Sequence, residues 1–446
     1  MYLKKEKFLI VGVSKSGTSA CELLLSKGAK CFVYDDSETE AVKNAEKRLS
    51  EKGATIVYKS EVNELLAEIT VVLLSPGVAI DHEIPVRAKK LGKRIIGELE
   101  LAAELCVAPV IAVTGTNGKT TTCTMIDDIL KNGGEKPILC GNVGTPFSSV
   151  LDKITDDTLV VLETSSFQLE TISRFAPHVA VITNITPDHL SRHYNMENYI
   201  YLKGKILANL RESEYAVLNY DDGIVREFGE KTRAKVVYFS AQNEVNGAYV
   251  SDDKIFYKGK YVADIKSLPV GGEHNVLNLL AAVCVAEIVG MTEEAICSGI
   301  KEFKGVKHRI QYIRTVNGAD YYNDSKATNA DATMKAIDSM NKPTTLILGG
   351  KDKGLDFDAL FRKISESLVK AVVLTGESAP RLYDSAKKIG YKNVYLANDF
   401  FVAVKLASIV AENGEAVLLS PACSSFDCFT DYEERGDRFI EIVEKL

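Results

Sequence analysis

Eight consecutive residues have the composition of a phosphate-binding loop. The apolar run 110–113 ends at Thr114-Gly115-Thr116-Asn117-Gly118-Lys119-Thr120-Thr121, and a helical pattern follows. Glycines let backbone N–H groups approach phosphate oxygens at a helix start, a lysine can neutralise phosphate charge, and a threonine hydroxyl can hold Mg²⁺. The common spacing G-x-x-x-x-G-K-[ST] requires glycine at position 113, where Val113 stands. The order of strand, glycine loop, Lys-Thr-Thr and helix therefore predicts a phosphate site of a variant kind.

Polar side chains follow two further apolar runs in the same part of the chain. The run 159–162 is followed by Glu163, and the run 179–183 is followed, after a short loop, by Asp188 and His189. Ligands collect at the carboxyl ends of strands in open α/β sheets. A carboxylate in this position can orient Mg²⁺ beside phosphates, although it can also be a plain helix N-terminal acid. The neighbouring Asp188 favours a functional interpretation of the histidine over a structural one.

Three loops near the C-terminus carry lysines or serines after predicted strands. They are 323–329 (Asn-Asp-Ser-Lys-Ala-Thr-Asn), 349–354 (Gly-Gly-Lys-Asp-Lys-Gly) and 420–427 (Ser-Pro-Ala-Cys-Ser-Ser-Phe-Asp). Each loop alone is compatible with ordinary turn chemistry. Together, two lysine-bearing loops and a serine-rich loop favour an anionic substrate that carries a carboxylate.

The N-terminal strand is followed by a glycine loop of a different kind. Residues 12–17 (Gly-Val-Ser-Lys-Ser-Gly) and the pair Asp35-Asp36 at the end of the next strand resemble the dinucleotide-binding fingerprint. Ser14 replaces the middle glycine, which hinders close approach of a pyrophosphate and argues against NAD. Binding of another nucleotide diphosphate stays open.

Short apolar runs alternate with helical patterns throughout, which predicts an α/β protein built from parallel units. A turn-rich, strand-like patch at 236–265 interrupts this alternation. We expect three domains, 1–98, 99–305 and 306–446, with errors of several residues at each boundary. The strands are expected at 8–11, 29–34, 55–58, 71–74, 94–96, 110–113, 159–162, 179–183, 215–218, 320–322, 345–348, 371–374, 393–396 and 416–419.

Composition narrows the class of protein. The chain has 446 residues and a net charge of −7, which argues against a general nucleic-acid binder. Its nine cysteines form no C-x-x-C pair, so we expect reduced, mostly buried thiols in a cytoplasmic protein. The apolar N-terminal run 8–13 is too short for a targeting signal, and we expect no membrane association.

Taken together, these motifs resemble the Mur ligase superfamily, which includes folylpolyglutamate synthetase and uses the shortened phosphate loop. The resemblance covers essentially the whole chain and rests on 114–121, 163–170, 308–309, 323–329, 420–427 and 435–437. These motifs are similar to those of the members that add D-glutamate to UDP-N-acetylmuramoyl-L-alanine in peptidoglycan synthesis. The resemblance implies a monomeric amide ligase that uses ATP and two Mg²⁺ ions and forms an acyl phosphate. It also implies a Rossmann-like N-terminal domain, a central ATPase domain and a Rossmann-like C-terminal domain.

The resemblance also assigns roles to individual residues, which stand here at the matching positions of the motifs. For ATP these are Gly115, Thr116, Asn117, Gly118, Lys119, Thr120, Thr121, Asn278, Arg309 and Asp324. For magnesium they are Thr120, Glu163, His189 and Lys203, of which the last three form the catalytic set with Lys119. For the UDP-muramoyl substrate they are Ser16, Asp35, Asp36, Asn142 and Arg192, and for D-glutamate Thr328, Lys353, Ser425, Phe426 and Tyr432.

For Lys203 the resemblance implies a covalent modification of the side chain. It lies on a helix predicted over 197–210, where a solvent-exposed face is the default for a lysine. In the family, the matching lysine carries a carbamate, which turns a cation into a metal-binding carboxylate. Lys205 is the nearby competitor for this role.

Four alternatives compete with this interpretation. The first is a sister Mur ligase with another acceptor amino acid, and the second is a folylpolyglutamate synthetase-like ligase. The serine-rich loop 420–427 favours D-glutamate over both. An NAD-dependent oxidoreductase is disfavoured by Ser14 and leaves the Lys119 loop without a role. A non-catalytic ATP-binding module has no need of the additional substrate-type loops.

Overall fold

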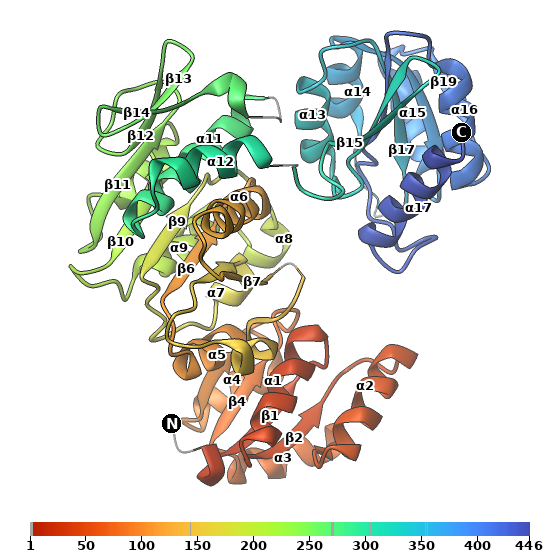
Figure 1. Ribbon diagram of the computed structural model, residues 1–446. Coiled ribbons are helices and arrows are strands. Elements are labelled where there is room, and N and C mark those ends of the chain that lie inside the picture. The colour runs from red at the N-terminus through yellow and green to blue at the C-terminus, as the bar shows by residue number, and fades with distance from the viewer. Residues whose placement is uncertain (1–2, 143, 269–271, 304, 353, 355) are drawn as a thin grey trace. The chain divides into compact units, whose positions relative to one another are not determined.

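The computed structural model describes residues 3–142, 144–268, 272–303, 305–352, 354 and 356–446. The chain divides into two compact units close to Phe303, and the first unit contains two of the three sheets. Each sheet is built from buried apolar strands with helices between them, so the predicted α/β class is confirmed (Figure 1).

The N-terminal sheet has five parallel strands in the order β3-β2-β1-β4-β5. Its order reverses between β1 and β4, so the loops after these two strands meet at one edge of the sheet. The strands are β1 (Lys7–Val11), β2 (Lys30–Tyr34), β3 (Thr55–Ile56), β4 (Val71–Leu74) and β5 (Arg94–Gly97). The helices are α1 (Lys15–Ser26), α2 (Glu40–Glu51), α3 (Lys59–Glu68), α4 (Glu83–Lys90) and α5 (Glu98–Leu105).

The central sheet has nine strands in the order β14-β13-β12-β11-β10-β9-β6-β8-β7. The strands from β7 to β12 are parallel, and β12, β13 and β14 form an antiparallel meander, which is the predicted turn-rich patch. The strands are β6 (Val110–Thr114), β7 (Ile138–Gly141), β8 (Val160–Glu163), β9 (Val179–Ile182), β10 (Tyr215–Asn219), β11 (Lys235–Ser240), β12 (Ala248–Ser251), β13 (Lys254–Tyr257) and β14 (Lys260–Asp264).

Helices cover this sheet, and α6 packs against α11 and α12 (Figure 1). They are α6 (Lys119–Asn132), α7 (Ser166–Leu169), α8 (Leu190–His193), α9 (Met196–Gly204), α10 (Gly223–Phe228), α11 (Glu273–Ile288) and α12 (Glu293–Glu302). The helix predicted over 197–210 is shorter than expected, because α9 ends at Gly204 and a 3₁₀ turn, Lys205–Leu207, follows.

The second unit has a six-stranded sheet in the order β15-β16-β20-β17-β18-β19, parallel except for the edge strand β15. The strands are β15 (Gln311–Val316), β16 (Ala319–Asn323), β17 (Thr344–Gly349), β18 (Val369–Thr375), β19 (Val394–Leu396) and β20 (Ala416–Leu419). The helices are α13 (Ala330–Asp338), α14 (Asp358–Ser365), α15 (Ala379–Ile389), α16 (Phe400–Val410) and α17 (Tyr432–Glu444).

Two strands, β7 and β15, were not predicted. Both lie at sheet edges. Polar residues interrupt β15, whereas β7 is a short apolar run whose first two residues are not buried. All nine cysteines are free and six are buried, as expected. Among the residues described, no helix is long and apolar enough to cross a membrane.

Candidate functional site

The predicted phosphate loop connects β6 to the N-terminus of the 14-residue helix α6. Two of its glycines have left-handed backbone conformations, with φ of 148° at Gly115 and 85° at Gly118. A Cβ atom at Gly115 would lie 1.9 Å from Thr183 Oγ1, and one at Gly118 would lie 2.2 Å from Asn278 Oδ1. Only glycine therefore fits both positions, and the loop presents its backbone at the helix end that favours anions.

A neighbouring segment, Thr183 to Thr186, holds this loop in place. Thr116 N donates to Asn184 O at 2.8 Å, and Asn117 N donates to Asn184 Oδ1 at 2.9 Å. Thr183 Oγ1 donates to Asn117 O at 2.6 Å. The loop conformation is thus fixed by protein contacts.

Two candidates for phosphate or metal binding, Lys119 and Glu163, lie around the same strand ends. Lys119 Nζ donates to Gly115 O and Thr116 O, each at 2.9 Å, so its ammonium group lies over the loop. Glu163, the last residue of β8, is buried, and its Oε1 accepts from Asn142 Nδ2 at 2.9 Å. This contact brings a predicted metal ligand together with a predicted substrate residue.

Lys203 is buried, which contradicts the exposed face expected for a lysine on this helix. Its Nζ donates to Gly115 O at 2.6 Å, directly beneath the phosphate loop. Burial holds the pKa of Lys203 well below its usual value, and the nearby Lys119 lowers it further. Lys205 is half-buried and instead donates to Glu170 O at 2.7 Å. The two lysines therefore differ in position: Lys203 contacts the phosphate loop, and Lys205 contacts Glu170.

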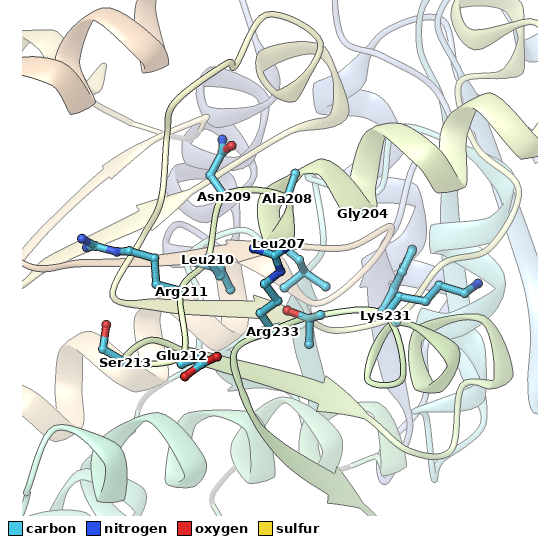
Figure 2. A pocket seen from close by; sticks show the side chains of 12 residues that line it. Gly204, Leu207, Ala208, Asn209, Leu210, Arg211, Glu212, Ser213, Lys231 and Arg233 are labelled. Carbon is cyan, nitrogen blue, oxygen red and sulfur yellow. The ribbon is translucent and has the colours of Figure 1, made fainter.

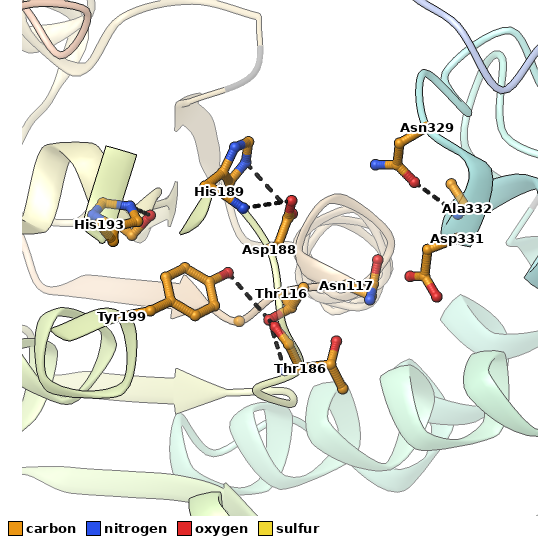
Figure 3. Close-up of polar contacts among 12 residues, drawn as sticks. Thr116, Asn117, Thr186, Asp188, His189, His193, Tyr199, Asn329, Asp331 and Ala332 are labelled. Carbon is orange, nitrogen blue, oxygen red and sulfur yellow. Dashed lines mark hydrogen bonds and ion pairs between the residues drawn. The ribbon is translucent and has the colours of Figure 1, made fainter. Parts of the chain in front are cut away.

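His189 is the N-terminal cap of α8, and its exposed ring stands beside Asp188, with Nε2 3.4 Å from Asp188 Oδ2 (Figure 3). Its backbone has a left-handed φ of 52°, a conformation that costs energy for a residue other than glycine. Within the described residues no group of three His, Cys, Asp or Glu side chains is arranged to hold a metal by itself.

These residues fit a nucleotide with Mg²⁺, because Mg²⁺ commonly takes one or two protein ligands and fills its shell with phosphate oxygens and water. Thr120 in the first turn of α6 and Glu163 supply a hydroxyl and a carboxylate of the right chemistry. Asn278 adjoins the loop, since its Oδ1 accepts from Thr122 Oγ1 at 3.3 Å.

The predicted UDP and muramoyl residues lie elsewhere in the first unit. Asp35 Oδ2 accepts from Val13 N at 2.8 Å in the N-terminal glycine loop, next to Ser16. Asp36 is paired with His82 at 2.9 Å. Arg192 contacts Glu170 at 2.7 Å and donates to the carbonyl oxygens of Gly77 and Val78, and it thereby links the central sheet to the loop after β4.

In the second unit the predicted residues lie at the ends of β16 and β20. Asp324 is buried and accepts from Ser420 Oγ at 2.7 Å, and burial raises its pKa to about 7. Ser425 is buried, Thr328 is half-buried, and Phe426 is exposed. Arg309 lies close enough to Asp324 to lower its pKa against the effect of burial. Lys353 lies outside the described residues.

Sequence reasoning gave no role to Arg435, which organises these loops. Its buried guanidinium donates to Ser325 Oγ at 2.9 Å, Ser325 O at 2.8 Å and Cys423 O at 3.0 Å. It therefore ties the loop 323–329 to the loop 420–427. Tyr432, on the same helix, contributes its carbonyl oxygen to Ser325 Oγ at 2.8 Å.

A separate pocket of about 820 Å³ lies beside the segment that follows Lys203 (Figure 2). Its lining includes the apolar Leu207 and Leu210 and the cationic Arg211, Lys231 and Arg233. None of the predicted site residues lines it.

Comparison with known proteins identifies the family. The Mur ligase middle-domain model matches residues 113–286, the Mur ligase glutamate ligase domain matches 308–423, and the MurD-like N-terminal domain of Mur ligases matches 6–97.

Full-length relatives agree with these domain matches. UDP-N-acetylmuramoylalanine–D-glutamate ligase of Caldanaerobacter subterraneus subsp. tengcongensis is 41% identical over 449 residues, and the alignment covers 100% of both chains. The enzyme of the same name from Koribacter versatilis is 42% identical over 451 residues, covering 100% of this chain and 99% of the relative.

Solved structures share the fold at lower identity. MurC from Thermotoga maritima superimposes with a TM-score of 0.61 at 22% identity, over 99% of both chains. MurF from Acinetobacter baumannii gives a TM-score of 0.64 at 18% identity, over 94% of this chain and 91% of that one. Since three domain models and full-length relatives above 40% identity agree, the chain belongs to the Mur ligase family.

Proposed function

We propose that the chain is an ATP-dependent amide ligase that joins D-glutamate to UDP-N-acetylmuramoyl-L-alanine in cytoplasmic peptidoglycan precursor synthesis. The observation that carries this proposal is a phosphate loop with a buried lysine beneath it, in a chain 41% identical end to end to a D-glutamate ligase. We further propose that residues 1–98 bind the UDP-muramoyl substrate, 99–305 bind ATP, and 306–446 bind the amino acid, in a monomer.

The chemical difficulty of this reaction is that a carboxylate oxygen is a poor leaving group. Transfer of the γ-phosphoryl group of ATP to the L-alanine carboxylate forms an acyl phosphate and releases ADP. The amine of D-glutamate then attacks the acyl carbon, the C–O bond to phosphate breaks, and phosphate leaves with the former carboxylate oxygen. Catalysis consists mainly of positioning and of neutralising charge.

The phosphate loop supplies most of that neutralisation. Its backbone N–H groups and the start of α6 face the phosphates, and Lys119, held over Gly115 and Thr116, places a positive charge beside them. Thr120, Glu163 and His189 would hold two Mg²⁺ ions, which when bound neutralise phosphate charge. Asn278, Arg309 and Asp324 are assigned to the rest of the nucleotide.

Lys203 is proposed to carry a carbamate. Burial and the neighbouring Lys119 lower the pKa of Lys203, which favours the uncharged amine, the form that adds to CO₂. The nitrogen forms a bond to carbon and loses a proton to water, which leaves an anionic group below the phosphate loop. Lys205, whose ammonium is occupied by Glu170 O, is the weaker candidate.

The remaining substrate roles follow the family resemblance. Ser16, Asp35 and Asp36 are assigned to the UDP part, and Asn142 and Arg192 to the muramoyl part. Thr328, Lys353, Ser425, Phe426 and Tyr432 are assigned to D-glutamate. Uridine recognition follows the resemblance least closely, because Ser14 and Lys15 depart from the more apolar glycine loop that the resemblance leads us to expect.

Phosphate release with UDP-N-acetylmuramoyl-L-alanine and a panel of D- and L-amino acids tests the proposal. We expect strong stimulation by D-glutamate and little by other amino acids. Stimulation by a different amino acid would assign the chain to a sister ligase. ATP binding without turnover on any amino acid would support a non-catalytic module.

A further inference from the structure

His193 lies at the centre of an aromatic column that no assigned role explains. It is the last residue of α8, and it is 2% exposed. Its ring stacks on Phe167 with a centroid distance of 5.2 Å and on Tyr199 with a distance of 5.4 Å, at interplanar angles of 29° and 28°. The imidazole is therefore packed against one ring from α7 and another from α9.

One hydrogen bond and the two ring contacts hold this imidazole. Its Nε2 lies 3.0 Å from Ser166 Oγ, whereas its buried Nδ1, 3.4 Å from Glu170 Oε1, makes no hydrogen bond within the described residues. Burial, followed by the positive charges of Arg192 and other neighbours, lowers the pKa of His193 to about 4. The ring is therefore neutral at neutral pH, and it stacks as an uncharged aromatic group.

Tyr199, the next ring in the column, contacts the phosphate-binding residues themselves (Figure 3). Its hydroxyl lies 3.1 Å from Thr116 Oγ1, and the Nζ atom of Lys203 lies 5.1 Å from the centre of its ring. Thr116 Oγ1 donates its one proton to Thr186 O at 3.0 Å, so in this pair the tyrosine hydroxyl is the donor. A tilt of the tyrosine ring would move both this donor and the surface beneath Lys203.

We propose that His193 is a positioning residue, which holds the Tyr199 ring so that its hydroxyl reaches Thr116 and its face supports Lys203. Stacked aromatic pairs prefer a narrow range of arrangements, so a flat ring at position 193 restricts the tilt of Tyr199 more tightly than an aliphatic side chain does. The inference rests on the proposed function for the role of Lys203, but the packing of the column is independent of the substrate.

Two substitutions of similar volume separate positioning from mere space filling. His193→Phe keeps a flat ring and removes both nitrogens, whereas His193→Leu fills the space without a flat face. We expect His193→Leu to lower kcat roughly tenfold, because small displacements of catalytic groups are costly, and His193→Phe to stay within about threefold of wild type. The KM for D-glutamate should be unchanged in both.

A second readout uses the protein without ATP or metal. With ¹³CO₂, the carbamate carbon of Lys203 gives an NMR signal whose intensity reports occupancy. We expect His193→Phe to keep this signal and His193→Leu to weaken it several-fold. If wild type showed no D-glutamate ligation, the proposed function would fail, while the order of the two variants in carbamate occupancy would still test the placement of Lys203.

The control is His178→Leu, which removes another histidine of the same unit that contacts a tyrosine, Tyr215, at a centroid distance of 5.8 Å. It should leave kcat and the carbamate signal unchanged. Equal behaviour of the Leu and Phe variants at position 193, whether both active or both impaired, would overturn the proposal. An equal loss in His178→Leu would overturn it as well.

Discussion

The phosphate loop of the first unit and the loops at the end of the second sheet are held in different ways. Backbone groups and short side chains of the segment Thr183 to Thr186 hold the phosphate loop, close to the strand from which it emerges. One buried side chain, Arg435, holds the loops 323–329 and 420–427 from a helix that follows both in the chain. The first region is thus stabilised by several contacts from one segment. In the second, a single guanidinium makes several of the contacts, beside the direct hydrogen bond from Ser420 Oγ to Asp324.

The largest loss of activity is expected at the phosphate loop. Lys119→Ala removes the ammonium group that lies over Gly115 and Thr116, so kcat for ligation should fall by about 10³-fold or more, while the fold is kept. Ligation rates and thermal unfolding of the same sample provide the measurement. Lys231→Ala, at an exposed lysine of the same unit, is the control, and a near wild-type rate in Lys119→Ala would remove its phosphate role.

A second loss is expected just below that loop. Lys203→Ala should lower kcat by about 10²-fold or more, because it removes the proposed carbamate, and added short carboxylates should restore part of the activity. Lys205→Ala should keep more activity, since its ammonium binds Glu170 O away from the phosphate loop. The measurement is the ligation rate of each variant with and without added acetate. An equal, mild loss of kcat in both variants would contradict the carbamate and indicate a structural role for Lys203.

The comparison between the two regions is tested most sharply at Arg435. Arg435→Met keeps much of the side-chain length but leaves Ser325 O and Cys423 O without their donor, so the second unit should lose about 2–4 kcal/mol of stability. Removing one phosphate-loop contact with Thr183→Val should cost only about 1 kcal/mol. Urea unfolding measures the free energy of unfolding of both variants. Similar decreases would contradict the difference proposed between the two regions.

The smallest effect is expected for Ser425→Ala. If Ser425 donates to a carboxylate of D-glutamate, the KM for D-glutamate should rise roughly tenfold while the KM for ATP changes little. Ser424→Ala is the matched control, because Ser424 is the adjacent buried serine and its Oγ has no hydrogen-bond partner in the described part of the chain. A rise of the ATP KM equal to that for D-glutamate would place Ser425 outside the amino-acid site.

Features whose residues are contiguous in the chain could be predicted from the sequence. The phosphate loop is contiguous, and each of its residue types has a local reason, so Gly115 to Thr121 could be placed from the sequence between strand β6 and the first turn of helix α6. Central strands such as β6 and β17 contain apolar runs and were predicted. The edge strand β15 is interrupted by polar residues, and the edge strand β7 is an apolar run of only three residues before a glycine.

Long-range burial could not be predicted in this way. Lys203 and Arg435 are charged residues whose default position on a helix is the exposed face, and only the packing of distant elements shows that both side chains are buried. Likewise, His193 meets Phe167 and Tyr199 because three separate helices converge, for which the sequence carries no local signal. The functional roles of all the site residues stay predictions.

The central claim is that the substrate carboxylate is activated as an acyl phosphate. UDP-N-acetylmuramoyl-L-alanine labelled with ¹⁸O in its carboxylate, incubated with ATP, Mg²⁺ and D-glutamate, tests it directly by mass spectrometry of the products. The account predicts one ¹⁸O atom in the phosphate released for each amide bond formed, with ADP as the other product. Amide formation with unlabelled phosphate, or with AMP in place of ADP, would contradict it.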